Sequence, residues 1–373
     1  MELCHDLAVL SGPHLPAGSV AVVIGTRPEA VKVAGVVALL GAAAEVVHTG
    51  QHYDRDLWAA VAAEVGLPAP AVELAVGGSS RGRQLGEATA ALDGAFAARA
   101  GRLRAVLVQG DTTTALAGAL AANAGGLSLV HVEAGLRSHD RRLPEEHNRV
   151  LVDHLADLLC APTSTSRGNL LAEGLPADRI VVTGNTVVEA VQRLLPPPGE
   201  RAALCAAHQV RPAGFVLATL HRPENVDDPA VLSAILEDLR SLGIPVVLPL
   251  HPRTRARAPR LEGLRVTPPL PPRAFLSLQA EAALIISDSG GVQEEASVLG
   301  RPVLVVRRST ERPEVLGTVC ELVQPGERLR ALARERLADV AGWRARLEAL
   351  PSPYGDGTAS QRTVAALIAL LGA

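Results

Sequence analysis

Residues 105–122, AVLVQGDTTTALAGALAA, contain the unit from which most of the chain is built. An apolar run ends in the polar turn Gln109-Gly110-Asp111, and an Ala- and Leu-rich segment typical of a helix follows. Near-continuous apolar strands that alternate with helices indicate a parallel sheet covered on both faces. This stretch therefore predicts an α/β fold and puts Asp111 directly after a buried strand.

The same pattern of strand, loop and helix recurs along the chain. In the first half it predicts strands in SVAVVIGT, AEVVHTG, AVLVQGD, LSLVHVEAG and DLLCAPT. After a break at PPPG (196–199) it predicts strands in GFVLATLH, IPVVLPLH, LRVTPPL, AALIISDSGG and RPVLVV. A chain of 373 residues is too long for one ordinary core. We therefore expect an extension (1–18), an N-terminal Rossmann-like domain (19–195) and a C-terminal Rossmann-like domain (200–355).

The composition argues against several classes of partner. The formal net charge of −3 gives no reason to expect a nucleic acid or a membrane surface. Apolar runs are interrupted before ~18 residues, so no transmembrane helix is expected, and the N-terminus lacks the basic region of a signal peptide. The four Cys residues are scattered, which is typical of a reducing cytoplasm. Of these, Cys160 and Cys205 are expected to be small core residues.

Polar residues gather where the predicted strands end. In parallel α/β sheets, ligands bind beyond the carboxyl ends of the strands. Both halves carry polar residues at this edge, so a cleft between two facing domains is the expected site. The residues at these strand ends are Gly25-Thr26-Arg27, Gly50-Gln51-His52, Gln109-Gly110-Asp111, His131–Glu133, His221-Arg222, His251 and Ser287–Gly291.

The stretch ISDSGGVQEEA (286–296) is a candidate anion site. A strand ends here, a Ser-Gly-Gly loop follows, and a helix is expected to begin near Val292. Free N–H groups at a helix N-terminus favour anions such as a diphosphate, and Gly290 and Gly291 would let the anion approach closely. Glu295 would accept hydrogen bonds from ribose hydroxyls, because a carboxylate repels phosphate. The alternative is an ordinary Gly-rich turn.

The first strand is followed by GTRPEAVK (25–32), which lacks the GxGxxG fingerprint of dinucleotide-binding proteins. We therefore expect no NAD. A helix is expected to start at Pro28, and Arg27 beside it suits a phosphate better than a core. Lys32 has two interpretations, a phosphate contact and a solvated helix residue.

The segment HVEAGLRSHDRRLPEEHNR (131–149) holds three Glu, one Asp, four Arg and three His. With the turn at Asp111 it supplies three candidate carboxylates, Asp111, Glu133 and Glu145. Carboxylates in different environments can divide acid and base roles. Each also has a structural alternative: a helix N-cap for Asp111, an ion pair with Arg137 for Glu133, and a helix start for Glu145.

His221, in LATLHRPEN, follows the first strand of the second half. A histidine beside a phosphate can stabilise a departing diphosphate. The His residues show no HExxH or similar spacing, so no metal is expected.

Ten motifs occur in the order seen in the non-hydrolysing UDP-N-acetylglucosamine 2-epimerases, and the chain resembles that family from about residue 19 to its end. The short RSHDRRLPEE spacing is similar to the archaeal-type branch. The motifs are GTRPEAVK, TGQHYD, VQGDTTTALAGALAA, HVEAGLRS, LPEEHNR, GNTVVEAV, LHRPEN, DSGGVQEEA, TERPE and PYGDG.

The resemblance implies a GT-B fold, that is, two Rossmann-like domains with a UDP-sugar in the cleft, and a last helix (356–373) that crosses back to the first domain. It also implies a cytoplasmic homodimer without a cofactor. The implied activity is the interconversion of UDP-GlcNAc and UDP-ManNAc, by elimination of UDP to a 2-acetamidoglucal and re-addition.

The resemblance assigns roles to individual residues. Asp111, Glu133 and Glu145 would be the acid–base carboxylates, and His221 would assist the leaving diphosphate. The residues that would hold UDP are Arg27, Lys32, Phe275, Ser289, Gly290, Gly291, Glu295 and Arg312. Gln51, His52 and Arg83 would be remnants of a second UDP-GlcNAc site, and we predict no strict requirement for an activator.

Three other functions compete with this interpretation. One is 2-epimerisation of another UDP-sugar, such as UDP-2,3-diacetamido-2,3-dideoxy-glucuronic acid. A GT-B glycosyltransferase would need an acceptor site and would not explain three convergent carboxylates. A UDP-sugar-binding protein without catalysis would not explain Asp111, Glu133, Glu145 and His221 together.

Overall fold

The computed structural model describes residues 15–51, 55–78, 80–250, 252–258 and 261–372. The chain divides into two compact units. The first consists of Met1–Leu136, Arg141–Thr186 and Gly357–Ala373, and the second of Arg137–Asp140 and Val187–Asp356. The two units are described separately below.

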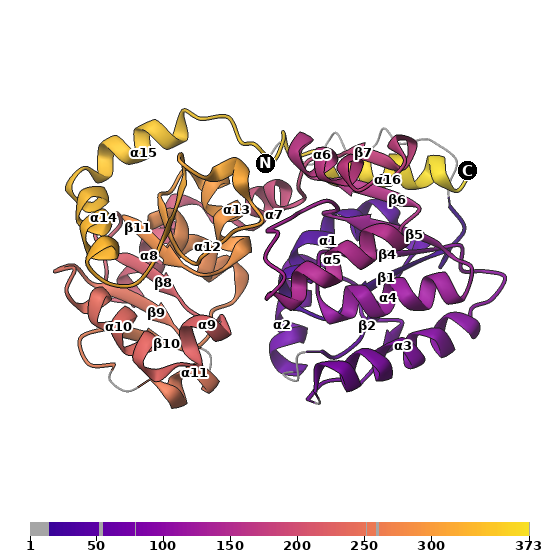
Figure 1. The fold of residues 1–373 in the computed structure, drawn as a ribbon, viewed down its shortest axis with the longest axis horizontal. Coiled ribbons are helices and arrows are strands. Elements are labelled where there is room, and N and C mark those ends of the chain that lie inside the picture. Colours follow the sequence, from indigo (N-terminus) through magenta and orange to yellow (C-terminus); the bar gives the residue numbers. More distant parts are fainter. Residues whose placement is uncertain (1–14, 52–54, 79, 251, 259–260, 373) are drawn as a thin grey trace. The chain divides into compact units, whose positions relative to one another are not determined.

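The first unit contains a sheet of seven parallel strands in the order β3-β2-β1-β4-β5-β6-β7 (Figure 1). All residues of the central strands β1 and β4 are buried, as their apolar runs predict. The predicted strands of this half are therefore confirmed. The strands are β1 (Val20–Ile24), β2 (Ala44–His48), β3 (Val72–Glu73), β4 (Ala105–Gln109), β5 (Ser128–Val132), β6 (Leu158–Ala161) and β7 (Ile180–Val182).

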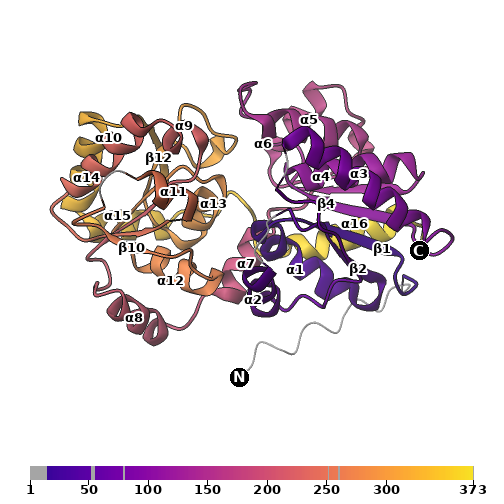
Figure 2. The same cartoon turned by 90° about the horizontal axis from the view of Figure 1, so that it is seen from below.

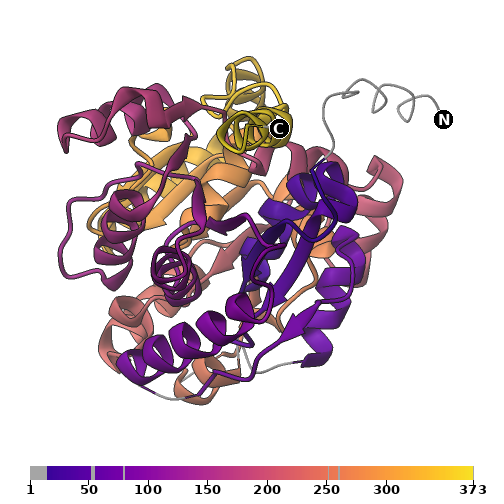
Figure 3. The ribbon, with the colours of Figure 1, turned by 90° about the vertical axis from the view of Figure 1, so that its right-hand side faces the viewer.

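Helices cover both faces of this sheet, as the view in Figure 3 shows. In Figure 2 the last helix of the chain, α16, lies beside α1 within this unit. The helices are α1 (Arg27–Leu40), α2 (Arg55–Val65), α3 (Arg81–Ala97), α4 (Thr113–Ala124), α5 (Pro144–Leu155), α6 (Ser164–Ala172) and α16 (Ala359–Leu370), with short 3₁₀ turns at Gly41–Ala43 and Ala177–Arg179.

Small residues bring α4 close to the sheet. A Cβ added to Gly118 would lie 2.9 Å from Val108 Cγ1 and 3.4 Å from Val23 Cγ1. The Ala-rich face of this helix is buried against β1, β4 and β5. Because the helix lies so close, its N-terminus is held firmly beside the turn that carries Asp111.

The second unit contains a sheet of six parallel strands in the order β10-β9-β8-β11-β12-β13. The strands predicted for this half are confirmed here too. They are β8 (Val216–Thr219), β9 (Val246–Pro249), β10 (Arg265–Thr267), β11 (Leu284–Ser287), β12 (Val303–Val306) and β13 (Cys320–Val323).

The helices of the second unit include α13, which begins at Gly290, earlier than the predicted start near Val292. The two glycines of the Ser-Gly-Gly loop therefore form its first turn. The helices are α7 (Val187–Leu194), α8 (Pro198–Ala207), α9 (Pro223–Val226), α10 (Pro229–Arg240), α11 (Pro252–Arg257), α12 (Pro272–Glu281), α13 (Gly290–Leu299), α14 (Glu327–Ala338) and α15 (Val340–Glu348), with a 3₁₀ turn at Pro313–Val315.

Each sheet has one point where the strand order reverses direction. In the first unit this point lies between β1 and β4, and in the second between β8 and β11. The loops that leave such a pair of strands diverge to opposite faces and open a crevice, where ligands of doubly wound sheets bind. The loops concerned begin at Gly25, Gly110, Leu220 and Asp288.

No helix among the described residues is both long and apolar enough to cross a bilayer. Cys160 and Cys205 are buried free thiols, as predicted.

Candidate active site

Glu133 lies in the loop after β5 and has a backbone φ of 71°. A non-glycine residue in this left-handed region is strained, and such strain is commonly retained at functional sites. Its side chain is only 4% exposed. The surrounding structure therefore holds this carboxylate in one place.

Lys32, on α1, is the ionic partner of Glu133. Its Nζ lies 2.7 Å from Oε1 and 2.8 Å from Oε2 of Glu133. The Lys32 side chain is 9% exposed, so its interpretation as a solvated helix residue is wrong. Gln109 Nε2 also donates to Glu133 Oε2, and Asn185 Nδ2 lies 3.5 Å from Oε1. A buried carboxylate with a cation and amide donors around it is favoured in its charged form.

Asp111 follows Gly110, which leaves β4 with a φ of 71°. A Cβ on Gly110 would lie 3.9 Å from Glu133 Oε2, so the two carboxylate-bearing loops are adjacent. Arg149 on α5 donates to Asp111 Oδ2 from Nε, at 3.1 Å, and from Nη2. The N-cap of α4 is Thr112, which accepts from Ala115 N. The N-cap alternative for Asp111 is therefore wrong.

Arg149 also contacts a fourth carboxylate that the sequence did not single out. Its Nη1 donates to Glu146 Oε2 at 2.8 Å, and Glu146 is buried. Asn148 Nδ2 donates to the carbonyl oxygen of Asp111 at 2.7 Å. One turn of α5 thus fixes both the backbone and the side chain of Asp111.

Glu145 lies in the first turn of α5, directly after Pro144, and is half-buried. Within the described part of the chain it makes no hydrogen bond and no ion pair. It differs in this respect from Asp111 and Glu133, which both face cations. Of the three carboxylates predicted from the sequence, two are therefore paired with cations, and Glu145 has no such partner among the described residues.

Glu29 joins two strand-end loops and was not predicted as a site residue. Its Oε2 accepts from the backbone N–H groups of Gly25, at 2.9 Å, and Thr26, at 2.6 Å. Its Oε1 accepts from the Thr112 hydroxyl at 2.6 Å. Burial raises the pKa of Glu29 above its ordinary value, although these hydrogen bonds lower it in part. The signal in the sequence is a Glu three residues after Thr26, which is the spacing of a capping box.

The predicted remnants of a second site are Gln51, which contacts the first turn of α4, together with Arg83 and His52. Gln51 Oε1 accepts from the N–H of Thr114, at 3.1 Å, and from its hydroxyl, at 2.7 Å. Arg83 is exposed and paired with Glu87 on the same helix, and His52 lies outside the described residues.

Arg27, the residue of the first unit that was predicted to contact UDP together with Lys32, begins α1 and is half-buried.

In the second unit, Asp288 is the centre of a hydrogen-bond network at the end of β11. It is fully buried and accepts from the N–H groups of His221 and Arg222 and from Asn225 Nδ2. His221 Nδ1 lies 2.8 Å from Asp288 Oδ1. Burial raises the pKa of Asp288, but the charge of His221 and the hydrogen bonds outweigh it, and the net pKa is lowered.

The His221 side chain is 57% exposed, although one ring nitrogen faces a buried carboxylate. Because Asp288 holds Nδ1, the ring has a defined orientation and Nε2 is available to a ligand. The sequence placed Asp288 in the strand-end loop but gave it no role. Its link to His221 depends on β8 lying next to β11.

Arg312 is part of a buried ion-pair network. Its Nε lies 2.8 Å from Glu294 Oε1, and its Nη1 donates to Glu311, which also pairs with Arg307. A Cβ on Gly290 would lie 2.6 Å from Glu311 Oε1 and 2.7 Å from Arg312 Nη1. The first residue of α13 must therefore be glycine for this network to form.

The remaining candidates of the second unit are Ser289, Glu295 and Phe275. Ser289 is the N-cap of α13, with an extended backbone and no capping hydrogen bond from its side chain. Glu295 accepts from Gln279 Nε2 at 2.6 Å, and Phe275, on α12 with Gln279, is half-buried.

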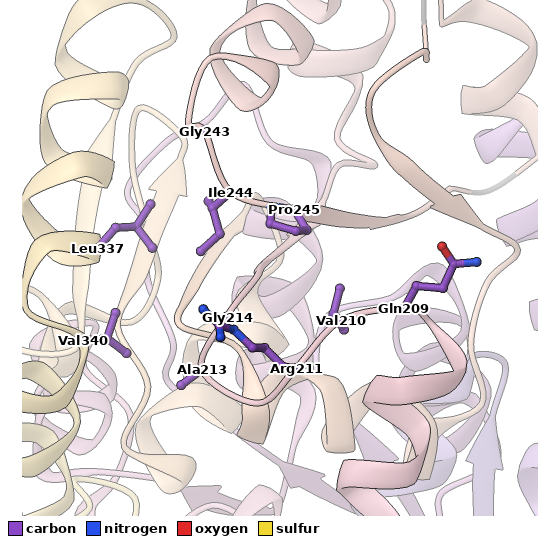
Figure 4. Close-up of a pocket in the computed structure, with 10 residues that line it drawn as sticks. All are labelled: Gln209, Val210, Arg211, Ala213, Gly214, Gly243, Ile244, Pro245, Leu337 and Val340. Carbon is purple, nitrogen blue, oxygen red and sulfur yellow. The ribbon is translucent and has the colours of Figure 1, made fainter.

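A hollow of about 580 Å³ in the second unit lies away from these residues (Figure 4). Its lining comes from residues that precede β8 and β9, such as Val210 and Ile244, and from Leu337 and Val340. It is therefore at the amino ends of the strands, whereas His221 and Asp288 lie at the carboxyl ends. Within the described residues, no group of three or more His, Cys, Asp or Glu side chains is arranged to hold a metal ion.

Comparison with known proteins identifies the family. Residues 38–368 match the family model described as UDP-N-acetylglucosamine 2-epimerase. The chain belongs to the UDP-N-acetylglucosamine 2-epimerase family. The family resemblance inferred from the sequence motifs is thereby confirmed.

Two relatives of this chain are epimerases that are named for different UDP-sugars. The UDP-N-acetylglucosamine 2-epimerase of Methanococcus maripaludis is 34% identical over 92% of this chain and 96% of its own. The UDP-2,3-diacetamido-2,3-dideoxy-D-glucuronate 2-epimerase of Pseudomonas aeruginosa is 37% identical over 79% of this chain and 84% of its own. The similarity to an archaeal member agrees with the predicted branch.

A solved epimerase structure supports the fold. The crystal structure of Methanocaldococcus jannaschii UDP-GlcNAc 2-epimerase in complex with UDP-GlcNAc and UDP matches with a TM-score of 0.81 and 33% identity. The match covers 94% of this chain and 99% of that one. The predicted GT-B class, with two Rossmann-like parallel-sheet units, is confirmed.

Proposed function

We propose that the protein is a UDP-N-acetylglucosamine 2-epimerase that interconverts UDP-GlcNAc and UDP-ManNAc without a cofactor. The observation that carries this proposal is a set of three carboxylates in the first unit, two directly after strands and one in the first turn of α5. Two of them, Asp111 and Glu133, are each held by a buried cation, and Glu145 is unpaired among the described residues.

The chemistry explains why several carboxylates are needed. The C2 proton of an N-acetylhexosamine is not adjacent to a carbonyl and is therefore not acidic. A base can remove it only as the C1–O bond to UDP breaks, and the electron pair of C2–H then forms the C1=C2 bond of 2-acetamidoglucal. Re-addition of UDP to C1, with protonation of C2 from the other face, gives the epimer. Acid and base groups are required on both faces of the ring.

The contacts of the carboxylates support different roles for them. Lys32 fixes the position of the Glu133 carboxylate and Arg149 that of Asp111, and carboxylates held in place suit proton abstraction and stabilisation of positive charge that develops at C1. Glu145 has no cation partner among the described residues, so its carboxylate can contact the sugar directly. We assign Lys32 to Glu133 rather than to UDP because its amino group lies between both carboxylate oxygens.

The second unit supports binding of the departing UDP. His221, oriented by Asp288, can stabilise the diphosphate by a hydrogen bond or by the positive charge of its protonated ring as the C1–O bond breaks. The N-terminus of α13 offers free N–H groups to the same anion. The further residues proposed to contact UDP are Arg27, Phe275, Ser289, Gly290, Gly291, Glu295 and Arg312.

A conversion assay tests the proposed activity. The enzyme is incubated with UDP-GlcNAc alone, and proton NMR follows the anomeric signals; we expect UDP-ManNAc to appear. Asp111→Asn, Glu133→Gln and Glu145→Gln should each lower the rate by about 10²–10⁴-fold, which is typical of a lost acid or base. Full activity in all three variants would contradict the assignment.

One alternative substrate follows from a specific relative. The Pseudomonas aeruginosa protein is named for UDP-2,3-diacetamido-2,3-dideoxy-D-glucuronate and is 37% identical. A parallel incubation with that sugar decides between the two substrates. Conversion of the uronate alone would replace the substrate of the proposal and leave its mechanism in place.

Two further features stay predictions. Activity with UDP-GlcNAc should need no additional activator; a rate from UDP-ManNAc that stays near zero until UDP-GlcNAc is added would contradict this. A cytoplasmic homodimer is expected from the family, and light scattering after size-exclusion chromatography would measure the oligomeric state.

A further inference from the structure

His131 and Asp153 form a fully buried pair in the first unit that the proposed mechanism does not use. Both side chains are 0% exposed. His131 Nδ1 lies 2.7 Å from Asp153 Oδ1, and His131 Nε2 lies 2.9 Å from the carbonyl oxygen of Gly110. Asp153 Oδ2 also accepts from the N–H of Gly135 at 3.1 Å.

These contacts join the three segments that carry the proposed acid–base residues. Gly110 directly precedes Asp111, and Gly135 lies in the same loop as Glu133. Asp153 lies on α5, and residues four apart on a helix share a face. Residues 145, 149 and 153 therefore lie along one face of α5, so the helix that carries Glu145 is fixed to both loops.

The contacts of His131 determine which of its ring nitrogens donates a hydrogen bond. A carbonyl oxygen only accepts, so His131 Nε2 must donate to Gly110. Nδ1 then shares a proton with the carboxyl group of Asp153. Both glycines have positive φ, 71° at Gly110 and 82° at Gly135, so each loop turns sharply where the pair holds it.

We infer that His131 and Asp153 are positioning residues, which hold Asp111, Glu133 and Glu145 in the mutual arrangement needed for the two proton transfers at C2. The inference rests on the proposed function. The pair touches no reacting atom; it acts through the backbone of the two loops. Displacement of a catalytic group by about 1 Å can cost 10²-fold in rate.

Two substitutions of Asp153 distinguish the effect of its hydrogen bonds on the loops from the effect of its charge. In Asp153→Asn, the amide nitrogen can donate to His131 Nδ1 while its oxygen accepts from Gly135 N, so both loops stay tied. In Asp153→Leu, which keeps the number and branching of the side-chain heavy atoms, both contacts are lost. A matched control is Asp157→Leu, because Asp157 accepts from the N–H of Leu129 at 2.8 Å, in the first half of β5 and away from the site.

The assay measures kcat and KM for epimerisation of UDP-GlcNAc, together with melting temperature. We expect kcat of Asp153→Leu to fall by about 10²-fold with little change in KM. Asp153→Asn should recover most of this loss. Asp157→Leu should lower the melting temperature without lowering kcat. Equal kcat losses in Asp153→Leu and Asp157→Leu, or normal kcat in Asp153→Leu, would overturn the inference.

Hydrogen–deuterium exchange provides a readout that does not depend on activity. Asp153→Leu should speed exchange in the loops at Gly110–Asp111 and Glu133–Gly135, and Asp153→Asn should not. If the wild type does not epimerise either UDP-sugar, the proposed function fails, and the exchange data still test the positioning. Unchanged exchange in both loops of Asp153→Leu would overturn it.

Discussion

Glu29 is a residue whose burial has a measurable consequence for stability. Burial raises its pKa above the ordinary value near 4.5, so the folded protein holds a proton there more tightly than the unfolded chain. This contribution to stability is complete below that ordinary value and is lost as pH rises through the folded-state pKa. Glu29→Gln cannot ionise. The unfolding free energy of the variant, relative to wild type, should therefore increase with pH above 4.5, as urea titrations at several pH values would measure.

Thr112→Val is the control for this prediction. The Thr112 hydroxyl donates to Glu29 and lowers its pKa, so its removal should move the pH-dependent loss of stability to higher pH. The substitution should also lower the unfolding free energy by about 1 kcal/mol at all pH values, because Thr112 is the N-cap of α4. A difference between Glu29→Gln and wild type that is flat with pH would contradict the account.

The sequence predicted which residues stand at the strand ends but not which side chains they meet. Glu133 and Asp111 could be placed because each follows an apolar run. Lys32 could not be paired with Glu133, since the two are 101 positions apart and meet only through the order of β1, β4 and β5. A sequence pattern fixes the position of a residue along its own strand, whereas a salt bridge depends on which strands are neighbours.

At the scale of elements, the long apolar strands and the long helices were predictable, whereas of the edge strands β10 was predicted and β3, β7 and β13 were not. The strands β3, β7 and β13 have two, three and four residues, and their side chains are partly exposed. A run that is short and only half-buried carries little hydrophobic signal. The missed edge strands do not affect the predicted site, because the loops with Asp111, Glu133 and Asp288 follow β4, β5 and β11, which are not edge strands.

The start of α13 provides a test of one element. Gly290→Ala puts a Cβ within 2.7 Å of both Glu311 and Arg312, whose buried ion pairs leave little room to move. We expect a loss of about 1–3 kcal/mol in unfolding free energy, as for other overpacked sites. Circular dichroism during urea unfolding would measure it.

Gly291→Ala is a matched control on the same helical turn. Apart from its chain neighbours and the backbone of the helix itself, the nearest atom to its Cβ would be Ser289 Oγ at 4.0 Å. Its stability should stay the same or rise by up to about 1 kcal/mol, because Ala favours a helix over Gly. Equal destabilisation by the two substitutions would show that the Glu311–Arg312 network does not impose glycine at Gly290.

At the scale of the whole molecule, the chain supplies each unit with its own parallel sheet and its own set of functional loops. The first unit contains the carboxylates, and the second contains His221, Asp288 and the N-terminus of α13. The residues between Glu133 and Glu145 include Arg137–Asp140, which belong to the second unit, and Asp140 accepts from Ser309 there. No single cut in the sequence therefore separates the two units.

The order of motifs along the chain is sufficient to predict that the acidic motifs belong to the first half and the Ser-Gly-Gly loop to the second. The contacts of His131, Asp153 and Glu29 could not be predicted, since each joins elements that are far apart in the sequence. These residues resemble ordinary core or capping residues until the strand order is known.

The central claim is that the protein breaks and re-forms the C2–H bond of a UDP-N-acetylhexosamine. The most direct test is proton NMR of the enzyme with UDP-GlcNAc in D2O. The account predicts UDP-ManNAc that carries deuterium at C2, and deuterium entering C2 of the remaining UDP-GlcNAc as equilibrium is approached. UDP-ManNAc that retains the original C2 proton, or UDP-GlcNAc that binds without any exchange, would contradict it.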